Sequence, residues 1–341
     1  MRVVKYPIAM KKSTLFKSAI LALLVCVGFA ACENNSSEVA EEPETYTVKL
    51  GWAGEILDVS YEPMATRAAT DDLYGIQVYS KPKTAGSTID WTPYAYGLFD
   101  DPDKITITLA SGYKYYFKAT MIKDGKNRLY FSDYNNGYNM PFVAGSTYLN
   151  SDNRFYYDGT YYMFNVDWGE AVLPDNKDYS HPNIERFYGE LSDYIPDEVN
   201  ENAQIDMKRT SFGAKFVVGG KMAVDGKLEI QINGAPKMEL ALTADTDEIS
   251  DIFSFFNIGE AWRKDDYTED IAVNFKWIRA DGTEAPLGTH TITFKRNVTT
   301  VVNININKDG NDESLGIAID ESETGVMPDG DEVTITNGQM E

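Results

Sequence analysis

The residue types that carry out acid–base, nucleophilic or metal chemistry are sparse or scattered in this chain of 341 residues. Its two histidines, His181 and His290, lie far apart in the sequence. The sequence lacks H-E-x-x-H, G-x-S-x-G, a phosphate-binding loop and a cysteine cluster, which are the usual signatures of hydrolases and nucleotide-binding enzymes. Paired carboxylates would serve a glycosidase, but among 53 acidic residues any pair is uninformative. We therefore expect no enzymatic activity and no cofactor.

Two acidic turns offer oxygen atoms of the kind that calcium prefers, at residues 100–103 and 309–312. Neither turn has the spaced ligands and the closing glutamate of an EF-hand loop. Turn formation alone explains why Asp, Asn, Gly and Pro gather at these positions. The sequence therefore predicts no metal site.

The side chain with the clearest covalent role is Cys32. It follows an apolar stretch, Leu15–Phe29, which is preceded by lysines and is short for a membrane span. Small residues before the cysteine and a polar tether after it resemble a bacterial lipoprotein signal. We expect cleavage behind Ala31 and a lipid on Cys32, with ordinary secretion as the alternative and Met10 as a second possible start.

Cysteine usage and charge narrow the class of protein further. The only other cysteine, Cys26, lies inside the signal, so the mature chain has no internal disulfide. The first 31 residues carry five basic and no acidic residues, so their removal changes the formal charge from −22 to −27. Such an acidic surface repels phosphate backbones. Nucleic acid is therefore excluded as a partner.

One arginine stands alone in a stretch of small residues. Arg67 is the only arginine between Arg2 and Arg128, and Ala68 follows it. It is either a solvated linker residue or a cleavage point for an arginine-specific protease, and flexible surroundings suit both interpretations.

The elements around Arg67 are predicted to be β-strands. On its N-terminal side Tyr46, Val48, Leu50 and Trp52 alternate with Thr, Lys and Gly, which is typical of a strand with one buried face. On its C-terminal side Leu73–Tyr79 is the next predicted strand. Short alternating segments and turn dipeptides such as Asp-Gly then continue along the chain.

These patterns predict an all-β protein with two tandem β-sandwich domains of the transthyretin-like type and one short helix in the second. Residues 169–206, rich in proline and acids, are predicted to cross between the domains. The helix is predicted from Ile249, Ile252, Phe253 and Phe256, with Asp245 as N-cap and Gly259 as its end. The predicted divisions are 1–31 signal peptide, 32–44 tether, 45–67 propeptide strand and cleavage linker, 68–205 N-terminal domain, 206–307 C-terminal domain and 308–341 acidic C-terminal segment.

Aromatic residues gather in a loop region and suggest a binding function of another class. Tyr157, Tyr162 and Trp168 belong to a stretch rich in Tyr, Phe and Trp, and exposed rings of this kind stack on sugars. β-Sheets also favour Tyr and Phe on both faces. A surface lipoprotein that binds glycans is therefore the alternative function.

The order of these features resembles the fimbrillin, or type V pilin, family of Bacteroidetes cell-surface lipoproteins. The resemblance rests on the signal ending at Cys32, the stretch Thr66-Arg67-Ala68 ahead of LYGIQVY, the opening MKRTSFGAKFVV of the second domain, and the closing strand TITFKRNVTTVVNININ. It implies a two-domain β-sandwich exported as a lipoprotein. In shaft-forming members an arginine-directed protease removes the segment before the mature start.

Carried over to this chain, the resemblance implies a cut at Arg67–Ala68 that releases the strand Tyr46–Trp52. A terminal strand of the next subunit would then fill the groove, as in other cases of strand addition. The candidate donor strands contain Leu315, Ile317 and Ile319, or Val333 and Ile335, and the latter is slightly favoured because it lies nearer the chain end.

The sequence as a whole therefore predicts a structural or accessory subunit of a cell-surface fimbria with a role in adhesion. Its expected partners are other fimbrial subunits, the outer membrane through the lipid anchor, and a ligand on a host or bacterial surface.

Overall fold

A computed structural model of the chain describes residues 44–60, 71–84, 88–157, 164–199, 201–219, 226–243, 247–306 and 317–326. Most of these residues lie in β-strands, which confirms the predicted all-β class. They belong to one compact unit, Pro43–Glu341. No helix within the described ranges is long and apolar enough to cross a membrane.

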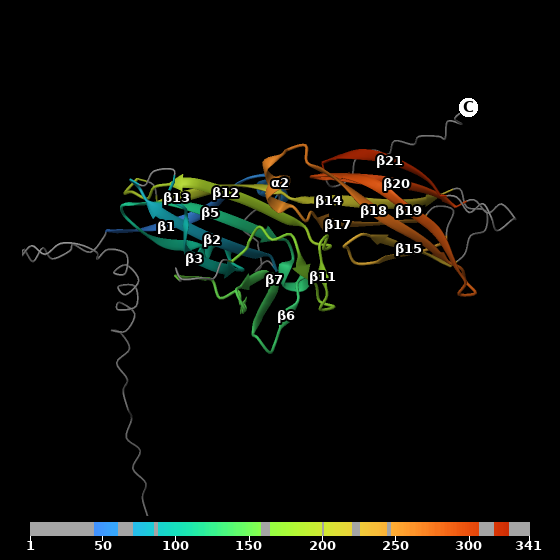
Figure 1. Cartoon of the computed structure of the whole chain (residues 1–341), viewed down its shortest axis with the longest axis horizontal. Coiled ribbons are helices and arrows are strands. Elements are labelled where there is room, and N and C mark those ends of the chain that lie inside the picture. Colours follow the sequence, from blue (N-terminus) through green and yellow to red (C-terminus); the bar gives the residue numbers. More distant parts are fainter. Residues whose placement is uncertain are drawn as a thin grey trace, which may run out of the picture. The chain divides into compact units, whose positions relative to one another are not determined.

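The N-terminal half, residues 44–209, is built on one eight-stranded sheet (Figure 1). In spatial order its strands are β4 (Thr106–Ala110), β1 (Thr45–Gly54), β13 (Asn202–Arg209), β12 (Arg186–Tyr194), β5 (Tyr113–Ile122), β2 (Leu73–Pro82), β3 (Thr92–Phe99) and β9 (Arg154–Tyr156). Neighbouring strands run antiparallel except β1 and β13, which are parallel.

This sheet encloses one hydrophobic core to which every one of its strands contributes. The hydroxyl of Tyr94 on β3 donates to the carbonyl oxygen of Thr108 on β4 at 2.8 Å, although β3 and β4 are not paired as neighbouring strands. The two sides of the sheet therefore meet around the core. Buried and exposed residues alternate along β13, as the two-residue period of extended chain predicts, whereas β2 is buried along most of its length because it contributes to this core and to a second cluster.

A second cluster of buried side chains lies against the sheet and collects short elements. These are α1 (Gly125–Arg128), β6 (Phe131–Ser132), β7 (Gly137–Ala144), β8 (Thr147–Leu149), β10 (Ala171–Val172) and β11 (Asp178–Tyr179), while the 3-10 turns are η1 (Glu55–Ser60) and η3 (Pro102–Lys104). Strands β6, β7 and β8 form one small sheet, and β10 pairs with β11.

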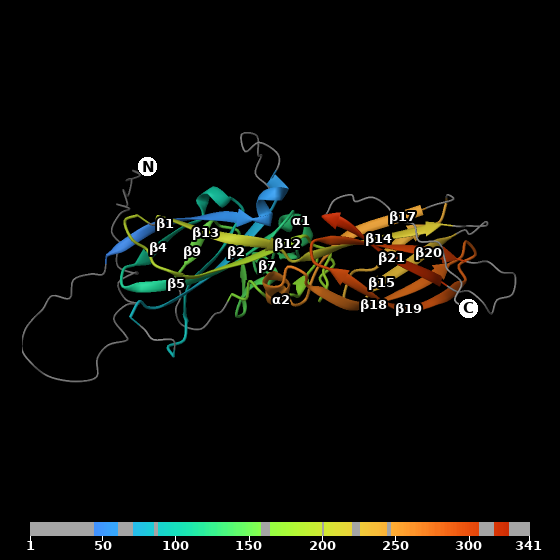
Figure 2. The same ribbon diagram turned by 90° about the horizontal axis from the view of Figure 1, so that it is seen from above.

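The C-terminal half, residues 211–326, is a β-sandwich (Figure 2). Its two sheets contain β17 (Asp247–Ser254), β14 (Ser211–Gly219), β20 (Val298–Ile306) and β21 (Ile317–Val326) in one, and β16 (Met238–Ala241), β15 (Lys227–Ile232), β18 (Thr268–Ile278) and β19 (Glu284–Lys295) in the other. Buried residues from both sheets form one shared core.

The predicted helix around Ile249–Phe256 is wrong, because this segment forms strand β17 and pairs along its length with β14. The sandwich core is contacted by Ile249, Phe253 and Phe255, which are separated by even numbers of positions and so lie on one face of the extended segment. Ile252 is not part of that core. The helical spacing therefore mixed residues from two faces of an extended chain. The short helix of this half, α2 (Ile258–Arg263), begins just beyond β17 and contains Gly259, while Asp245 lies outside the described residues.

The predicted crossing at 169–206 is also wrong as a description of this segment. It contains β10, β11, β12 and the start of β13, and β12 lies in the interior of the eight-stranded sheet. Strand β13 runs across the boundary predicted after residue 205 and pairs with β1 and β12. The three prolines of this segment lie between strands, whereas acidic residues such as Glu190 and Asp206 lie within β12 and β13.

The two halves are joined closely. β13 ends at Arg209 and β14 begins at Ser211, so only Thr210 separates them. Helix α2 of the C-terminal half places Ile258 and Trp262 in the second cluster of the N-terminal half. At Gly169 a Cβ atom would lie 1.8 Å from the carbonyl oxygen of Phe256, so only glycine fits this approach.

Candidate functional site

Strand β1 is paired along both of its edges. Lys49–Gly54 pairs with Asn202–Met207 of β13, and Thr45–Lys49 pairs with Thr106–Ala110 of β4. Within the eight-stranded sheet β4 has no neighbour other than β1. Loss of β1 would therefore leave two strands with unpaired backbone groups at once, which is unfavourable in water.

The side chains predicted to face inward from this strand do so. Val48 is completely buried and Leu50 almost so, and Tyr46 and Trp52 are partly buried against the same core. The Trp52 ring stacks on Tyr74 with 5.6 Å between ring centroids. Fully burying a side chain the size of Val or Leu contributes about 1.5–3 kcal/mol. β1 is therefore a substantial part of the core, not an appended edge.

Strand β4 is held on its other side by two tyrosines. The hydroxyl of Tyr94 donates to the carbonyl oxygen of Thr108 at 2.8 Å, and the N–H of Thr108 donates to the hydroxyl oxygen of Tyr157 at 2.9 Å. The two tyrosine rings meet edge to face at 5.6 Å. β4 thus keeps contacts that do not depend on β1, so the space between β4 and β13 is bounded on both sides without it.

The chain leaves β1 through a turn that only glycine can make. Gly54 has a φ of +80°, and a Cβ atom there would lie 2.0 Å from an oxygen of Asp206. The turn leads into η1 and directs the next residue, Glu55, towards the C-terminal half. Glu55 is thereby tied to the end of β1.

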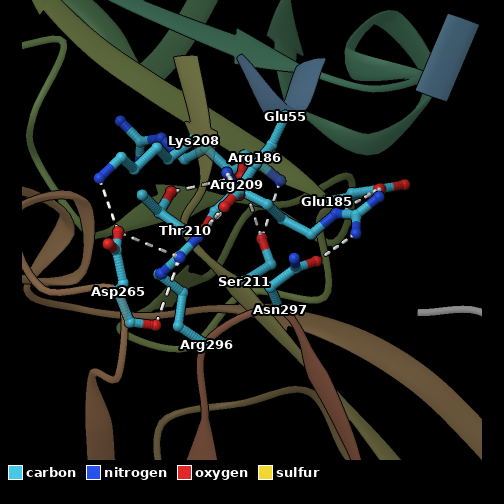
Figure 3. Close-up of polar contacts among 10 residues, drawn as sticks. All are labelled: Glu55, Glu185, Arg186, Lys208, Arg209, Thr210, Ser211, Asp265, Arg296 and Asn297. Carbon is cyan, nitrogen blue, oxygen red and sulfur yellow. Dashed lines mark hydrogen bonds and ion pairs between the residues drawn. The ribbon is translucent and has the colours of Figure 1, made fainter. Parts of the chain in front are cut away.

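Glu55 meets two arginines at the junction of the halves (Figure 3). The Nη1 of Arg296 donates to both carboxylate oxygens of Glu55, at 3.0 and 2.7 Å. The backbone N–H of Arg209 donates to Oε2 of Glu55 at 2.8 Å. The Arg296 side chain is only 5% exposed and that of Glu55 is 27% exposed, so a buried cation is neutralised by a carboxylate that still touches solvent.

The side chain of Arg209 is occupied elsewhere. It contacts Oε1 of Glu185 through Nε at 3.0 Å and Nη2 at 2.9 Å, and its Nη1 donates to the side-chain oxygen of Asn297. Its guanidinium also lies over the ring of Phe187. Arg209 therefore contributes only its backbone N–H to Glu55, and Arg296 supplies the charge.

These junction residues were not predicted from the sequence as a site. A signal for them exists, because Arg209 and Arg296 belong to the only two Lys-Arg dipeptides in a strongly acidic chain. Both dipeptides lie in the stretches MKRTSFGAKFVV and TITFKRNVTTVVNININ that carried the family resemblance. Their acidic partner could not be identified, because Glu55 is one of 53 acidic residues.

Several predicted site residues fall outside the described part of the chain. These are Cys32, Arg67, Ala68, Tyr162, Leu315, Val333 and Ile335. Ile317 and Ile319 lie in β21, whose backbone pairs antiparallel with β20, with Ile317 opposite Ile306 and Ile319 opposite Ile304. One candidate donor strand is therefore paired within its own chain.

The residues proposed for glycan contact have different environments. Tyr157 contacts Tyr94 and Thr108 beside β4, as described above. Trp168 is 43% exposed and donates from its indole N–H to Glu170 at 3.1 Å, and its carbonyl oxygen accepts from the buried Arg186. Tyr157 is 38% exposed and packs beside β4, and among the described residues no ring contact joins it to Trp168.

The histidine that is most buried has a structural setting. Nδ1 of His181 lies 2.9 Å from the carbonyl oxygen of Asn233, and Nε2 lies 3.1 Å from Glu269. Among the described residues, no group of three or more His, Cys, Asp and Glu side chains is arranged to hold a metal ion.

Comparison with known proteins identified structures but no sequence families. No family model and no curated protein matches the chain. The fimbrial anchor protein Mfa2 from Porphyromonas gingivalis is similar at 7% identity and a TM-score of 0.37, covering 83% of this chain and 98% of that one. The tip fimbrial protein Mfa3 of the same organism, with a C-terminal truncation, is similar at 11% identity and a TM-score of 0.27, covering 82% and 97%.

A candidate cell adhesion protein from Bacteroides eggerthii is similar at 10% identity and a TM-score of 0.39, covering 84% of this chain and 96% of that one. These three structures are thus fimbrial and cell adhesion proteins from the group of bacteria that the sequence resemblance named. At identities of 11% or less and TM-scores of 0.39 or less, these three likenesses assign no function to this chain.

Proposed function

We propose that this protein is a structural or accessory subunit of a cell-surface fimbria, exported as a lipoprotein through Cys32 and assembled by strand exchange. The observation that carries the proposal is the position of β1. It is the N-terminal strand of the described chain, it fills an interior place in the sheet, and a single cut at Arg67–Ala68 would sever it from the rest of the fold.

Release of β1 would create a site of defined shape. The groove would be lined by the core residues that Val48 and Leu50 now contact, and bounded by the free edges of β4 and β13. A strand from another subunit would cover the apolar groove and satisfy both edges through backbone hydrogen bonds. Because β4 is also held by Tyr94 and Tyr157, the groove would keep one wall while it is empty.

The acidic C-terminal segment supplies the donor in this proposal. β21 would first have to leave β20, with which it is paired along its length. The stretch containing Val333 and Ile335 follows β21 in the sequence and alternates apolar with polar residues, as a donor requires. We therefore favour Val333–Thr336 over Ile317–Ile319.

The test is the substitution Arg67→Ala in the full chain expressed on cells, with Arg128→Ala as a matched control on an exposed helical turn. Wild-type surface material is expected to start at Ala68 and to give a ladder of high-mass species on gels. Arg67→Ala should leave the chain folded, starting at Cys32 and without the ladder, whereas Arg128→Ala should behave as wild type. Polymerisation of the Arg67→Ala chain, or wild-type chains that all start at Cys32 without a ladder, would contradict the proposal.

A further inference from the structure

Arg296 and the backbone N–H of Arg209 form a carboxylate-binding site whose present occupant, Glu55, lies in the segment that a cut at Arg67 would separate from the fold. We propose that, after the cut, this site binds an acidic side chain on the donor strand of a second copy of the chain, namely Glu341. The inference rests on the proposed strand exchange and adds to it the group that fixes the donor in register.

The site cannot be left empty without cost. In the uncut chain the Arg296 side chain is 5% exposed. Among the described residues, its Nη atoms contact, besides Glu55, only the carbonyl oxygens of Arg209 and Asp265, at 3.0 and 3.3 Å, and the carboxylate of Asp265 at 3.7 Å, and its Nε has no hydrogen-bond partner there. A buried cation that loses its hydrogen-bonded carboxylate is strongly disfavoured. Departure of Glu55 therefore leaves the Arg296 guanidinium without its hydrogen-bonded carboxylate, which a second carboxylate would replace.

The neighbouring acidic side chains, Asp265 and Glu185, already pair with other cations. The carboxylate of Asp265 is 80% exposed and pairs with Lys208 at 2.6 Å. Glu185 is held by Arg209 through two contacts and pairs with Lys123 at 3.5 Å. Figure 3 shows Glu55 entering this cluster from the N-terminal half, apart from Asp265 and Glu185. The replacement carboxylate must come from outside these residues.

The position of the site allows it to fix the register of the donor strand. Gly54, the last paired residue of β1, lies opposite Met207 of β13, and Arg209 follows Met207 by two residues on β13. Backbone hydrogen bonds alone allow a strand to shift by two residues while keeping its apolar face inward. A carboxylate near the end of the groove limits this freedom, because a shift by two residues moves it by roughly 7 Å along the groove.

The C-terminal segment has the matching chemistry. Residues 308–341 carry ten acidic residues and one lysine. When Val333 and Ile335 are aligned with Val48 and Leu50, Glu341 falls one position beyond Glu55. When Ile317 and Ile319 are aligned in the same way, Thr324 falls at the position of Glu55 and Glu323 one position before it, but the backbone of this stretch is already paired with β20. On the favoured donor strand, Glu341 of a second copy is therefore the acidic side chain nearest to the position of Glu55.

The experiment compares Glu341→Gln with a control, Glu321→Gln, in the full chain on cells. N-terminal sequencing measures cutting, and the high-mass ladder measures assembly. Both variants should be cut behind Arg67. Glu341→Gln should reduce the ladder about tenfold or more at equal subunit levels, as expected for the loss of a charged hydrogen bond. Glu321→Gln should leave it unchanged, because Glu321 is not the occupant.

Arg296→Gln should reduce the ladder as Glu341→Gln does, and the double variant should be no worse than either single one. Because Arg296→Gln can also weaken the uncut fold, Glu341→Gln is the decisive change. A normal ladder from Glu341→Gln, or a ladder lost equally in Glu321→Gln, would overturn the inference while leaving strand exchange intact. A wild-type chain without any ladder would overturn both.

Discussion

Buried polar side chains in this protein are matched to individual partners. The guanidinium of Arg186 is completely buried, and it donates to the carbonyl oxygens of Trp168 and Val166, both at 2.6 Å, and to the hydroxyl of Thr120 at 2.9 Å. Burial lowers the pKa of Arg186 to about 10, which still leaves it charged at neutral pH. Buried donors persist where each has an acceptor, and Arg186 uses this to join a loop to β12 and β5.

Burial also favours the uncharged form of several tyrosine side chains, which raises their pKa values. Burial, with Asp167 and Glu190 nearby, raises the pKa of Tyr79 to about 12. Burial, with Asp197, raises the pKa of Tyr194 to about 12. Burial also raises the pKa of Tyr94, which holds β4. In each case the fold favours the protonated phenol.

We expect the protein to lose stability at alkaline pH. An unfolded tyrosine has a pKa of about 10, so a raised pKa in the fold contributes stability that is fully present below about pH 10 and is lost as pH rises towards 12. Urea midpoints should therefore be similar at pH 7 and pH 9 and fall steeply above pH 10. Tyrosinate absorbance should appear together with unfolding. A midpoint unchanged between pH 9 and pH 11 would contradict this.

At the scale of elements, the alternation of apolar and polar residues predicted β1 correctly, whereas apolar residues at helical spacing predicted a helix where the structure has strand β17. Tyr46–Trp52 lies in β1, where the alternating apolar residues pack on one core. Leu73–Tyr79 lies in β2, which is buried on both faces and contributes to two clusters. Ile249–Phe256 satisfied a helical pattern by chance, and pairing with β14 overrode it. Short apolar segments are ambiguous in this way because both periods fit a few positions. Strand β12 was not predicted within 169–206, because the prolines and acidic residues of that segment suggested a crossing between domains.

The inward face of β1 gives a prediction for the uncut chain. Leu50→Ala in the Arg67→Ala background should lower the free energy of unfolding by about 2–5 kcal/mol, the usual range for Leu in a core, because Leu50 is only 1% exposed. The neighbouring Lys49→Ala is the control. Lys49 points away from the core and forms an exposed ion pair with Asp103, so its loss should change stability by at most about 1 kcal/mol. Urea unfolding measures both, and equal effects would show that β1 does not pack as described.

At the scale of the molecule, the junction depends on residues far apart in sequence. Glu55 contacts Arg209 across 154 positions and Arg296 across 241. Hydrophobic periodicity carries no information on such pairs, since it reports only which face of an element is buried. The Lys-Arg dipeptides were visible in the sequence, but their shared partner required the fold. Strand β1 was therefore predictable from the sequence, whereas the contacts of Glu55 with Arg209 and Arg296 were not.

The parallel pairing of β1 with β13 has a consequence for folding kinetics. Lys49 pairs with Asn202, so roughly 150 residues must be in place before β13 can receive β1. Closing long loops costs entropy, and non-local pairing is slow. We expect β1 to dock last, after β2, β3 and β5, and pulse-labelled hydrogen exchange on the Arg67→Ala chain would show its amides protected late. If they gain protection together with those of β2, this order is wrong. A late folding intermediate and a processed subunit would then share one conformation, so the last step of folding is the one that assembly repeats between chains.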